Sequence, residues 1–169
     1  MFLKRLQSYT KEFNYNSIFC FFHSIMSILP LPSCNTSPAG AKPACLLSET
    51  LQQMADQKQF RQMLVCLEPC YSANMGQALD GIPGVLAICS AGPYEQSFAD
   101  SWSNELGVWM CDRFSRNLIG HAAEYPNGTY RDLYLYCAQH TLGSHVGIYN
   151  YTNFGNLYTT GPKDFFVKK

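Results

Sequence analysis

Three short runs of apolar residues, almost free of polar positions, constrain the fold of this chain more than any other feature. Residues 17–24 read SIFCFFHS, residues 62–68 read QMLVCLE and residues 84–90 read GVLAICS. A strand with one face in water alternates apolar and polar residues, whereas a strand covered on both faces is apolar throughout. The sequence therefore predicts a sheet that is buried between two layers of helices.

The segments around these runs carry helical and loop signals. Residues 31–45 form a loop rich in Pro, Ser and Gly, and a helix is expected after it over residues 49–60, with Ser or Thr as its N-cap. Apolar residues at helical spacing predict a second helix over residues 100–118. A third helix is expected over residues 129–141, and a last strand over residues 145–151. This order is typical of an α/β domain with a largely parallel sheet.

Length and charge narrow the class of protein. A chain of 169 residues is about one domain, and we assign residues 17–169 to it and leave residues 1–16 poorly assigned. With 12 basic and 12 acidic residues, the formal net charge of zero gives no electrostatic reason to expect a nucleic acid as partner. The apolar residues 18–31 are too few and too interrupted for a stable membrane span.

The eight cysteines do not form a metal pattern. Cys66 and Cys89 lie inside apolar runs and are expected in the core, and the Cys and His spacings fit no zinc site, so we expect neither metal nor cofactor. Disulfides and the compartment stay open. The basic and apolar N-terminus leaves a signal peptide possible, and LPSC, ending at Cys34, leaves open a lipoprotein-anchored binding domain.

Two reactive side chains lie at the ends of predicted strands. His23 follows Phe22 near the end of the first run, and Cys70 comes two residues after the second. In open α/β sheets, functional groups gather at the carboxyl ends of strands. A thiol reacts as its thiolate, and a nearby imidazole is the natural group to take its proton. His121 and His140, which lie beside helical segments, are expected at the surface.

LVCLEPCYSANM at residues 64–75, the helix before it, GVLAICSAG after it and GSHV at residues 143–146 resemble the legumain-like cysteine peptidases. These form peptidase family C13 of the caspase-like clan, which includes the GPI transamidase catalytic subunit. The resemblance implies a caspase-like three-layer sandwich with a mainly parallel sheet flanked by helices. It also implies hydrolysis of peptide bonds in peptide or protein substrates, and a secretory, lysosome-like or extracellular setting.

The resemblance implies a role for each matching residue. Cys70 is the nucleophile of a Cys–His dyad that acts through a thioester acyl-enzyme, and His23 is its base. Glu68, Ser90 and Asp100 match the glutamate, the serine and the helix-opening aspartate of the family's specificity pocket. His145, within the Ser-His-Val element, is expected to be structural.

The chain departs from the family at several points. Ser24 replaces the glycine after the catalytic histidine, and the family's first βα unit, which carries an arginine of the specificity pocket, has no counterpart here. Without that arginine, a preference for asparagine is not expected. These departures support an alternative interpretation, a catalytically degenerate C13-like domain that binds peptides or has a structural role.

Overall fold

The computed structural model describes residues 17–22 and 41–163 of the chain, and a four-stranded sheet lies at its centre. The first three strands in the order β1–β2–β3–β6 are parallel, and β6 runs antiparallel to β3. The prediction of a largely parallel sheet is therefore confirmed. The strands are β1 (Ser17–Phe22), β2 (Gln62–Leu67), β3 (Val85–Cys89) and β6 (Gly147–Tyr149).

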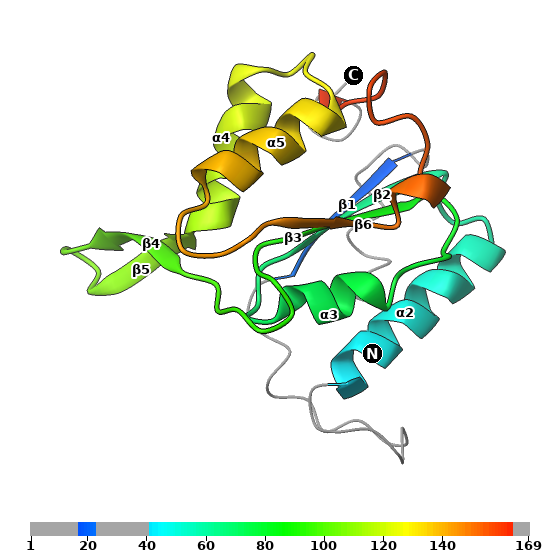
Figure 1. The fold of residues 1–169 in the computed structure, drawn as a ribbon, viewed down its shortest axis with the longest axis horizontal. Helices are drawn as coiled ribbons and strands as arrows, with labels where there is room; N and C mark the ends of the chain where they lie inside the picture. Colours follow the sequence, from blue (N-terminus) through cyan, green and yellow to red (C-terminus); the bar gives the residue numbers. More distant parts are fainter. Residues whose placement is uncertain (1–16, 23–40, 164–169) are drawn as a thin grey trace.

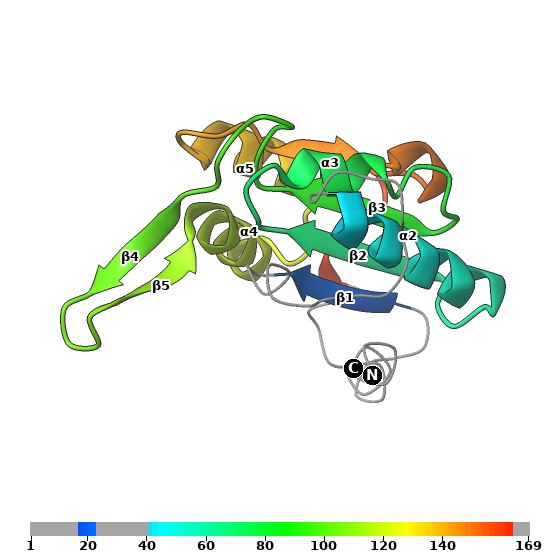
Figure 2. The ribbon, with the colours of Figure 1, turned by 90° about the horizontal axis from the view of Figure 1, so that it is seen from below.

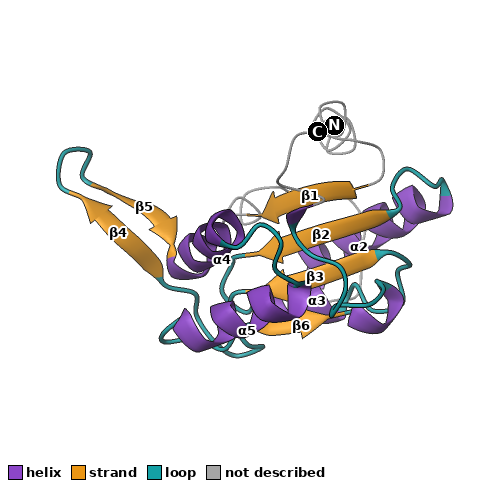
Figure 3. Cartoon of the chain, turned by 90° about the horizontal axis from the view of Figure 1, so that it is seen from above, coloured by secondary structure: helices purple, strands orange, loops and turns teal. Residues whose placement is uncertain are grey.

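Helices cover both faces of this sheet (Figures 1 and 3). One face carries α2 (Ala41–Asp56) and α3 (Ser72–Gln77). The other carries α4 (Arg113–Glu124) and α5 (Tyr130–His140), and a 3-10 turn, η2 (Tyr151–Asn153), follows β6. The described part of the chain is thus an α/β domain with three layers.

Alternate side chains of β2 and β3 enter two separate cores. Met63, Val65 and Leu67 of β2 pack with the α2 and α3 residues, whereas Leu64 and Cys66 pack with those of α4 and α5. Every one of these five side chains is fully buried. A strand with a core on each side has no solvent face, which explains the uninterrupted apolar runs.

The expected helix over residues 100–118 is wrong in its first part. A two-stranded hairpin, β4 (Ala99–Ser103) and β5 (Val108–Asp112), projects from the body of the domain, and α4 begins only at Arg113 (Figures 1 and 2). Gly107 closes the hairpin turn at φ 63°, a left-handed conformation that glycine adopts without strain. Much of the hairpin is open to solvent, so its apolar residues need not alternate, and their spacing matched a helix by coincidence. The exposed ones are Trp102, Leu106, Val108, Trp109 and Met110.

The helix after the first loop begins earlier than expected. We expected a loop to residue 45 and an N-cap near residue 48, but α2 starts at Ala41. Pro43 lies in its first turn. A backbone N–H at this place would have no acceptor within the helix, so proline, which has no N–H, is tolerated there.

The third helix begins as predicted, because the Thr129 side chain accepts from the Asp132 N–H and caps α5. Within the described residues, no helix is both long and apolar enough to cross a bilayer.

Candidate active site

Cys70 lies in the sharp turn that joins β2 to α3. The strand ends at Leu67, the helix begins at Ser72, and the Cys70 side chain between them is exposed. Tyr71 makes the turn possible by adopting φ 61°, a conformation that costs a tyrosine about 1–2 kcal/mol. The predicted position of Cys70, just beyond the carboxyl end of a parallel strand, is confirmed.

The loop that follows β3, residues 90–98, contacts Cys70 through its backbone. The Ser97 N–H donates to Cys70 Sγ over 3.4 Å. Two residues earlier, the Glu95 carbonyl accepts the N–H of Tyr71 over 2.8 Å. An N–H aimed at sulfur stabilises the thiolate form, which is the form that attacks.

A pocket of about 230 Å³ opens beside Cys70. It is smaller than the typical site for a drug-sized ligand or cofactor and suits a single side chain. Its walls come from the residues that follow β2, from the 90–98 loop and from the hairpin strands β4 and β5. The described residues that line it are Glu68, Cys70, Ser97, Ala99, Trp109, Met110, Cys111 and Asp112.

Two buried carboxylates line this pocket. Glu68 is 4% exposed and Asp112 is 6% exposed. Asp112 is the N-cap of α4, where its Oδ1 accepts the Phe114 N–H over 2.7 Å, and its Oδ2 accepts the Ser97 hydroxyl over 2.5 Å. Sequence reasoning missed Asp112 because it placed the helix start at Asp100. The preference of aspartate for N-caps would have pointed to it.

Two of the predicted pocket residues lie elsewhere. Asp100 does not open a helix; it lies on β4, and its carboxylate pairs with the exposed Arg116 at 2.5 Å. Ser90 is fully buried, 3.5 Å from the Ser72 hydroxyl, and its carbonyl accepts the Ser144 hydroxyl. The serine that lines the pocket in the described part of the chain is Ser97 rather than the buried Ser90.

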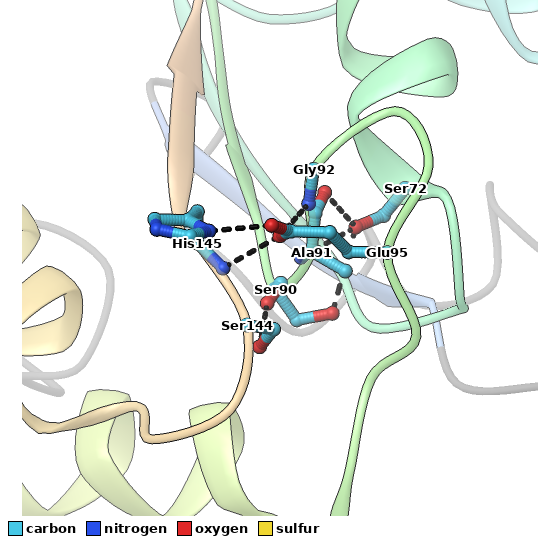
Figure 4. A network of polar contacts seen from close by, with 7 residues as sticks. All are labelled: Ser72, Ser90, Ala91, Gly92, Glu95, Ser144 and His145. Atoms are coloured by element: carbon cyan, nitrogen blue, oxygen red, sulfur yellow. Dashed lines mark hydrogen bonds and ion pairs between the residues drawn. The ribbon is translucent and has the colours of Figure 1, made fainter.

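A polar network joins the 90–98 loop to the segment before β6 (Figure 4). The Glu95 carboxylate accepts the N–H groups of Gly92 and His145 over 2.9 and 2.8 Å. The imidazole Nδ1 of His145 lies 2.5 Å from the other carboxylate oxygen. Hydrogen bonds from His145 and Gly92 lower the pKa of Glu95 to about 2.

Three of the four histidines lie in the described part of the chain, and His145 belongs to the polar network of Figure 4. His23, the expected base, lies outside the described residues. His140 is exposed as predicted, but His121 is buried between the rings of Tyr125 and Tyr136, so the expectation of a surface position is wrong for it. Burial lowers the pKa of His121 below 6.5.

Metal ligands do not cluster in the part of the chain that the structure describes. No group of three or more His, Cys, Asp or Glu side chains there could hold a metal ion. Among the groups that line the described site are a thiol, two carboxylates and the Ser97 N–H.

Comparison with known proteins gives consistent relatives. The model of the peptidase C13 family matches residues 17–161. Mouse legumain is 29% identical over 102 residues, which cover 59% of this chain and 23% of legumain. Human legumain is also 29% identical over 102 residues, covering 24% of its length. A Caenorhabditis elegans protein whose name assigns it to the GPI-anchor transamidases is 30% identical over 73 residues, or 43% of this chain and 23% of that protein. The matched region thus spans only about a quarter of each of these relatives.

Proposed function

This chain belongs to the peptidase C13 family, and we propose that it is a legumain-like cysteine endopeptidase domain with Cys70 as nucleophile. One observation carries the proposal. The exposed Cys70 thiol accepts an N–H from Ser97 at the mouth of a side-chain-sized pocket that contains the buried Glu68. A structural cysteine would be expected in an apolar site instead.

We propose His23 as the general base. The parallel register pairs Phe22, the last residue of β1, with Leu67, the last residue of β2. The chain therefore leaves β1 at the same edge of the sheet at which it leaves β2 toward Cys70. His23 directly follows Phe22 in the sequence.

The proposed reaction has two halves. His23 takes the proton of Cys70, and the thiolate sulfur forms a bond to the substrate carbonyl carbon. Backbone N–H groups, that of Cys70 included, stabilise the oxyanion, and the amine leaves with the proton from His23 as the C–N bond breaks. Water then attacks the thioester, which releases the acid and restores the thiol.

The pocket next to Cys70 is proposed to hold the side chain on the amino side of the cleaved bond, the P1 side chain. Glu68 and Asp112 supply acceptor oxygens and negative charge, and none of the described lining residues is basic. Such a pocket favours a P1 side chain that donates hydrogen bonds or is positively charged, and it repels a carboxylate. Arginine, lysine and asparagine are accordingly preferred to aspartate.

A set of electrophilic peptides tests this proposal. Acyloxymethyl ketones with Arg, Asn, Leu or Asp at P1 are incubated with the protein, and the modified residue is located by mass spectrometry. We expect covalent labelling at Cys70 that Cys70→Ser abolishes, together with cleavage of the matching peptide substrates. Cys111→Ser, which changes another cysteine of the pocket, is the matched control and should keep the label. A folded protein that no peptide labels at Cys70 contradicts the proposal.

Ser24 favours a second candidate, a degenerate domain that binds peptides without cleaving them. Serine lacks the backbone freedom of the family's glycine at this position. Ser24→Gly separates the two functions. If the wild-type chain binds the peptides without cleaving them and Ser24→Gly cleaves them, then the wild-type chain is the degenerate, peptide-binding domain.

A further inference from the structure

Glu95 lies at the centre of the network in Figure 4, and none of the proposed chemical steps involves it. Its Oε2 accepts two backbone N–H groups, from Gly92 within its own loop and from His145 before β6. Its Oε1 lies within hydrogen-bond distance of the imidazole Nδ1 of His145, at 2.5 Å. The carboxylate therefore closes a turn inside the 90–98 loop and binds that turn to a distant part of the chain.

The backbone of the same loop contacts both Cys70 and the residue after it, Tyr71. The Glu95 carbonyl accepts the N–H of Tyr71, the residue after Cys70, and the Ser97 N–H donates to the Cys70 sulfur. Glu95 and Ser97 are only two residues apart. A group that holds the backbone at Glu95 therefore also restrains the donor that faces the thiol, in addition to the bond from the Ser97 hydroxyl to Asp112.

Other contacts hold the ends of the loop. At its start, the Ala91 carbonyl accepts the Ala73 N–H, and at its end the Phe98 carbonyl accepts the Arg113 N–H. In between, the Asn74 amide donates to the Pro93 carbonyl over 2.9 Å, and the Glu95 carboxylate holds the turn from its other side through Gly92 and His145. A Cβ on Gly92 would lie 2.8 Å from Glu95 Oε2, so the carboxylate would have to shift if residue 92 carried a side chain.

The charge of Glu95 persists over a wide pH range. Its hydrogen bonds to His145 and Gly92 lower its pKa to about 2, so it remains ionised in neutral and in moderately acidic solution. An ionised carboxylate accepts N–H groups more strongly than a neutral acceptor does. The ionised Glu95 carboxylate is therefore present at neutral pH and at the moderately acidic pH of many cysteine peptidases.

From these contacts we propose that Glu95, anchored by His145, is a positioning residue that holds the Ser97 N–H against the Cys70 sulfur. The role rests on the proposed function of Cys70 as nucleophile. Glu95 itself touches neither the thiol nor the substrate. It acts through the loop, and His145 acts through Glu95.

The rate of alkylation of Cys70 by iodoacetamide tests the proposal. The rate is measured at each cysteine by mass spectrometry, with the partly exposed Cys45 on α2 as internal reference. In Glu95→Ala the Cys70 rate should fall severalfold relative to Cys45, because a displaced Ser97 N–H stabilises the reactive thiolate less. Glu95→Gln, whose amide oxygen can accept the same N–H groups, should recover much of this rate. Glu105→Ala, in the exposed hairpin turn, is the matched control and should leave it unchanged.

The effect of His145 should be smaller and not additive. His145→Ala removes only the imidazole contact and keeps the backbone N–H, so its Cys70 rate should lie between those of wild type and Glu95→Ala. The double variant should be no slower than Glu95→Ala, because Glu95→Ala already removes the single contact that His145→Ala breaks. A general loss of stability would instead lower the urea midpoint and speed Cys45 and Cys70 together.

Two results overturn the proposal: a wild-type rate at Cys70 in folded Glu95→Ala, or a larger effect of His145→Ala than of Glu95→Ala. If Glu95→Ala does not fold, His145→Ala must slow Cys70 alone among the cysteines, and a wild-type rate there is then decisive against it. Alkylation needs no peptide hydrolysis. A chain that never cleaves peptides but shows Glu95-dependent reactivity would refute the proposed peptide hydrolysis, and it would retain only the positioning of the Ser97 N–H against the Cys70 sulfur by Glu95.

Discussion

Ser97 donates its hydroxyl to the Asp112 carboxylate over 2.5 Å while its backbone N–H donates to the sulfur of Cys70. One residue thus joins the thiol at the mouth of the pocket to a carboxylate in its wall. A change at Asp112 acts on the stability of α4 and on the charge of the pocket, and different substitutions separate these two effects.

Asp112→Asn and Asp112→Ala should both alter P1 selectivity. Each removes one negative charge from the pocket, so kcat/KM for an arginine P1 substrate should fall by about tenfold or more, with little change for leucine. Only Asp112→Ala should also lower the free energy of unfolding, by about 1 kcal/mol, because asparagine caps a helix as well as aspartate does. Steady-state kinetics and urea titration of both variants measure the two effects. An unchanged Arg/Leu ratio in Asp112→Asn would show that this carboxylate does not contact the P1 side chain.

The cysteines should differ sharply in reactivity toward iodoacetamide. Cys70 is exposed, whereas Cys89 and Cys137 are fully buried, and burial raises the pKa of Cys137 to about 12 and that of Cys89 well above its ordinary value. At pH 7 the buried thiols should react more slowly than Cys70 by roughly a thousandfold, since the thiolate is the reactive form. Peptide mapping after timed alkylation gives each rate, and the same experiment in urea should remove the difference. Comparable native rates would contradict the burial of Cys89 and Cys137.

The sheet and its two helical layers were predictable because burial on both faces leaves a simple record, an unbroken apolar run. The same physical constraint fixed the position of Cys70, since functional groups in such sheets follow the strand ends. The hairpin was not predictable in this way. Its strands lack a fully buried face, so its apolar residues do not alternate with polar ones. Trp102 and Trp109 instead pair across the two strands, with their rings edge to face and the ring centroids 5.4 Å apart.

The pocket was only partly predictable for a related reason. Glu68 precedes Cys70 by two residues on one strand end, so its place follows from that of the cysteine. Ser97 approaches the sulfur through its backbone N–H, a group that every residue except proline carries and that leaves no signal in the sequence. Predicting Asp112 required the start of α4 to be located. The helix-like spacing of the apolar residues in the hairpin moved that expected start to residue 100.

His121 should make the protein less stable as the pH falls below 7. Burial lowers its pKa in the folded state, although Asp132 and Glu124 act in the opposite direction. In the unfolded chain, His121 takes up a proton near its ordinary pKa of about 6.5, whereas the folded protein resists protonation. The unfolded state therefore binds more protons in this range, and stability is lost as the pH falls from about 7 toward and through the lowered value.

Urea titrations at several pH values between 7 and 5 measure this loss. His121→Gln should reduce the pH dependence, because glutamine does not titrate. His140→Gln changes an exposed histidine on α5 whose charge is the last and smallest cause of the His121 shift, so it should change the slope much less than His121→Gln does. Equal slopes in wild type and His121→Gln would show that His121 is not the group responsible.

Asn150 should be among the most sensitive positions for stability outside the apolar cores. Its Nδ2 donates to the carbonyls of Ile82 and Val85 over 2.7 and 2.8 Å, and its Oδ1 accepts the Gly81 N–H over 2.9 Å. The side chain is 4% exposed and fastens the end of β6 to the turn before β3. Asn150→Ala should lower the free energy of unfolding by about 2–4 kcal/mol, since it leaves several buried backbone groups without this partner.

Backbone conformation contributes separately at this position, because Asn150 has φ 58°. Asparagine and glycine tolerate this left-handed region better than alanine, so Asn150→Gly should be less destabilised than Asn150→Ala by about 1 kcal/mol. Asn127→Ala changes an exposed asparagine and should stay within about 0.5 kcal/mol of wild type. If Asn150→Gly is as stable as wild type, backbone conformation alone explains the residue, and the hydrogen bonds of its amide do not stabilise the junction of β6 with β3.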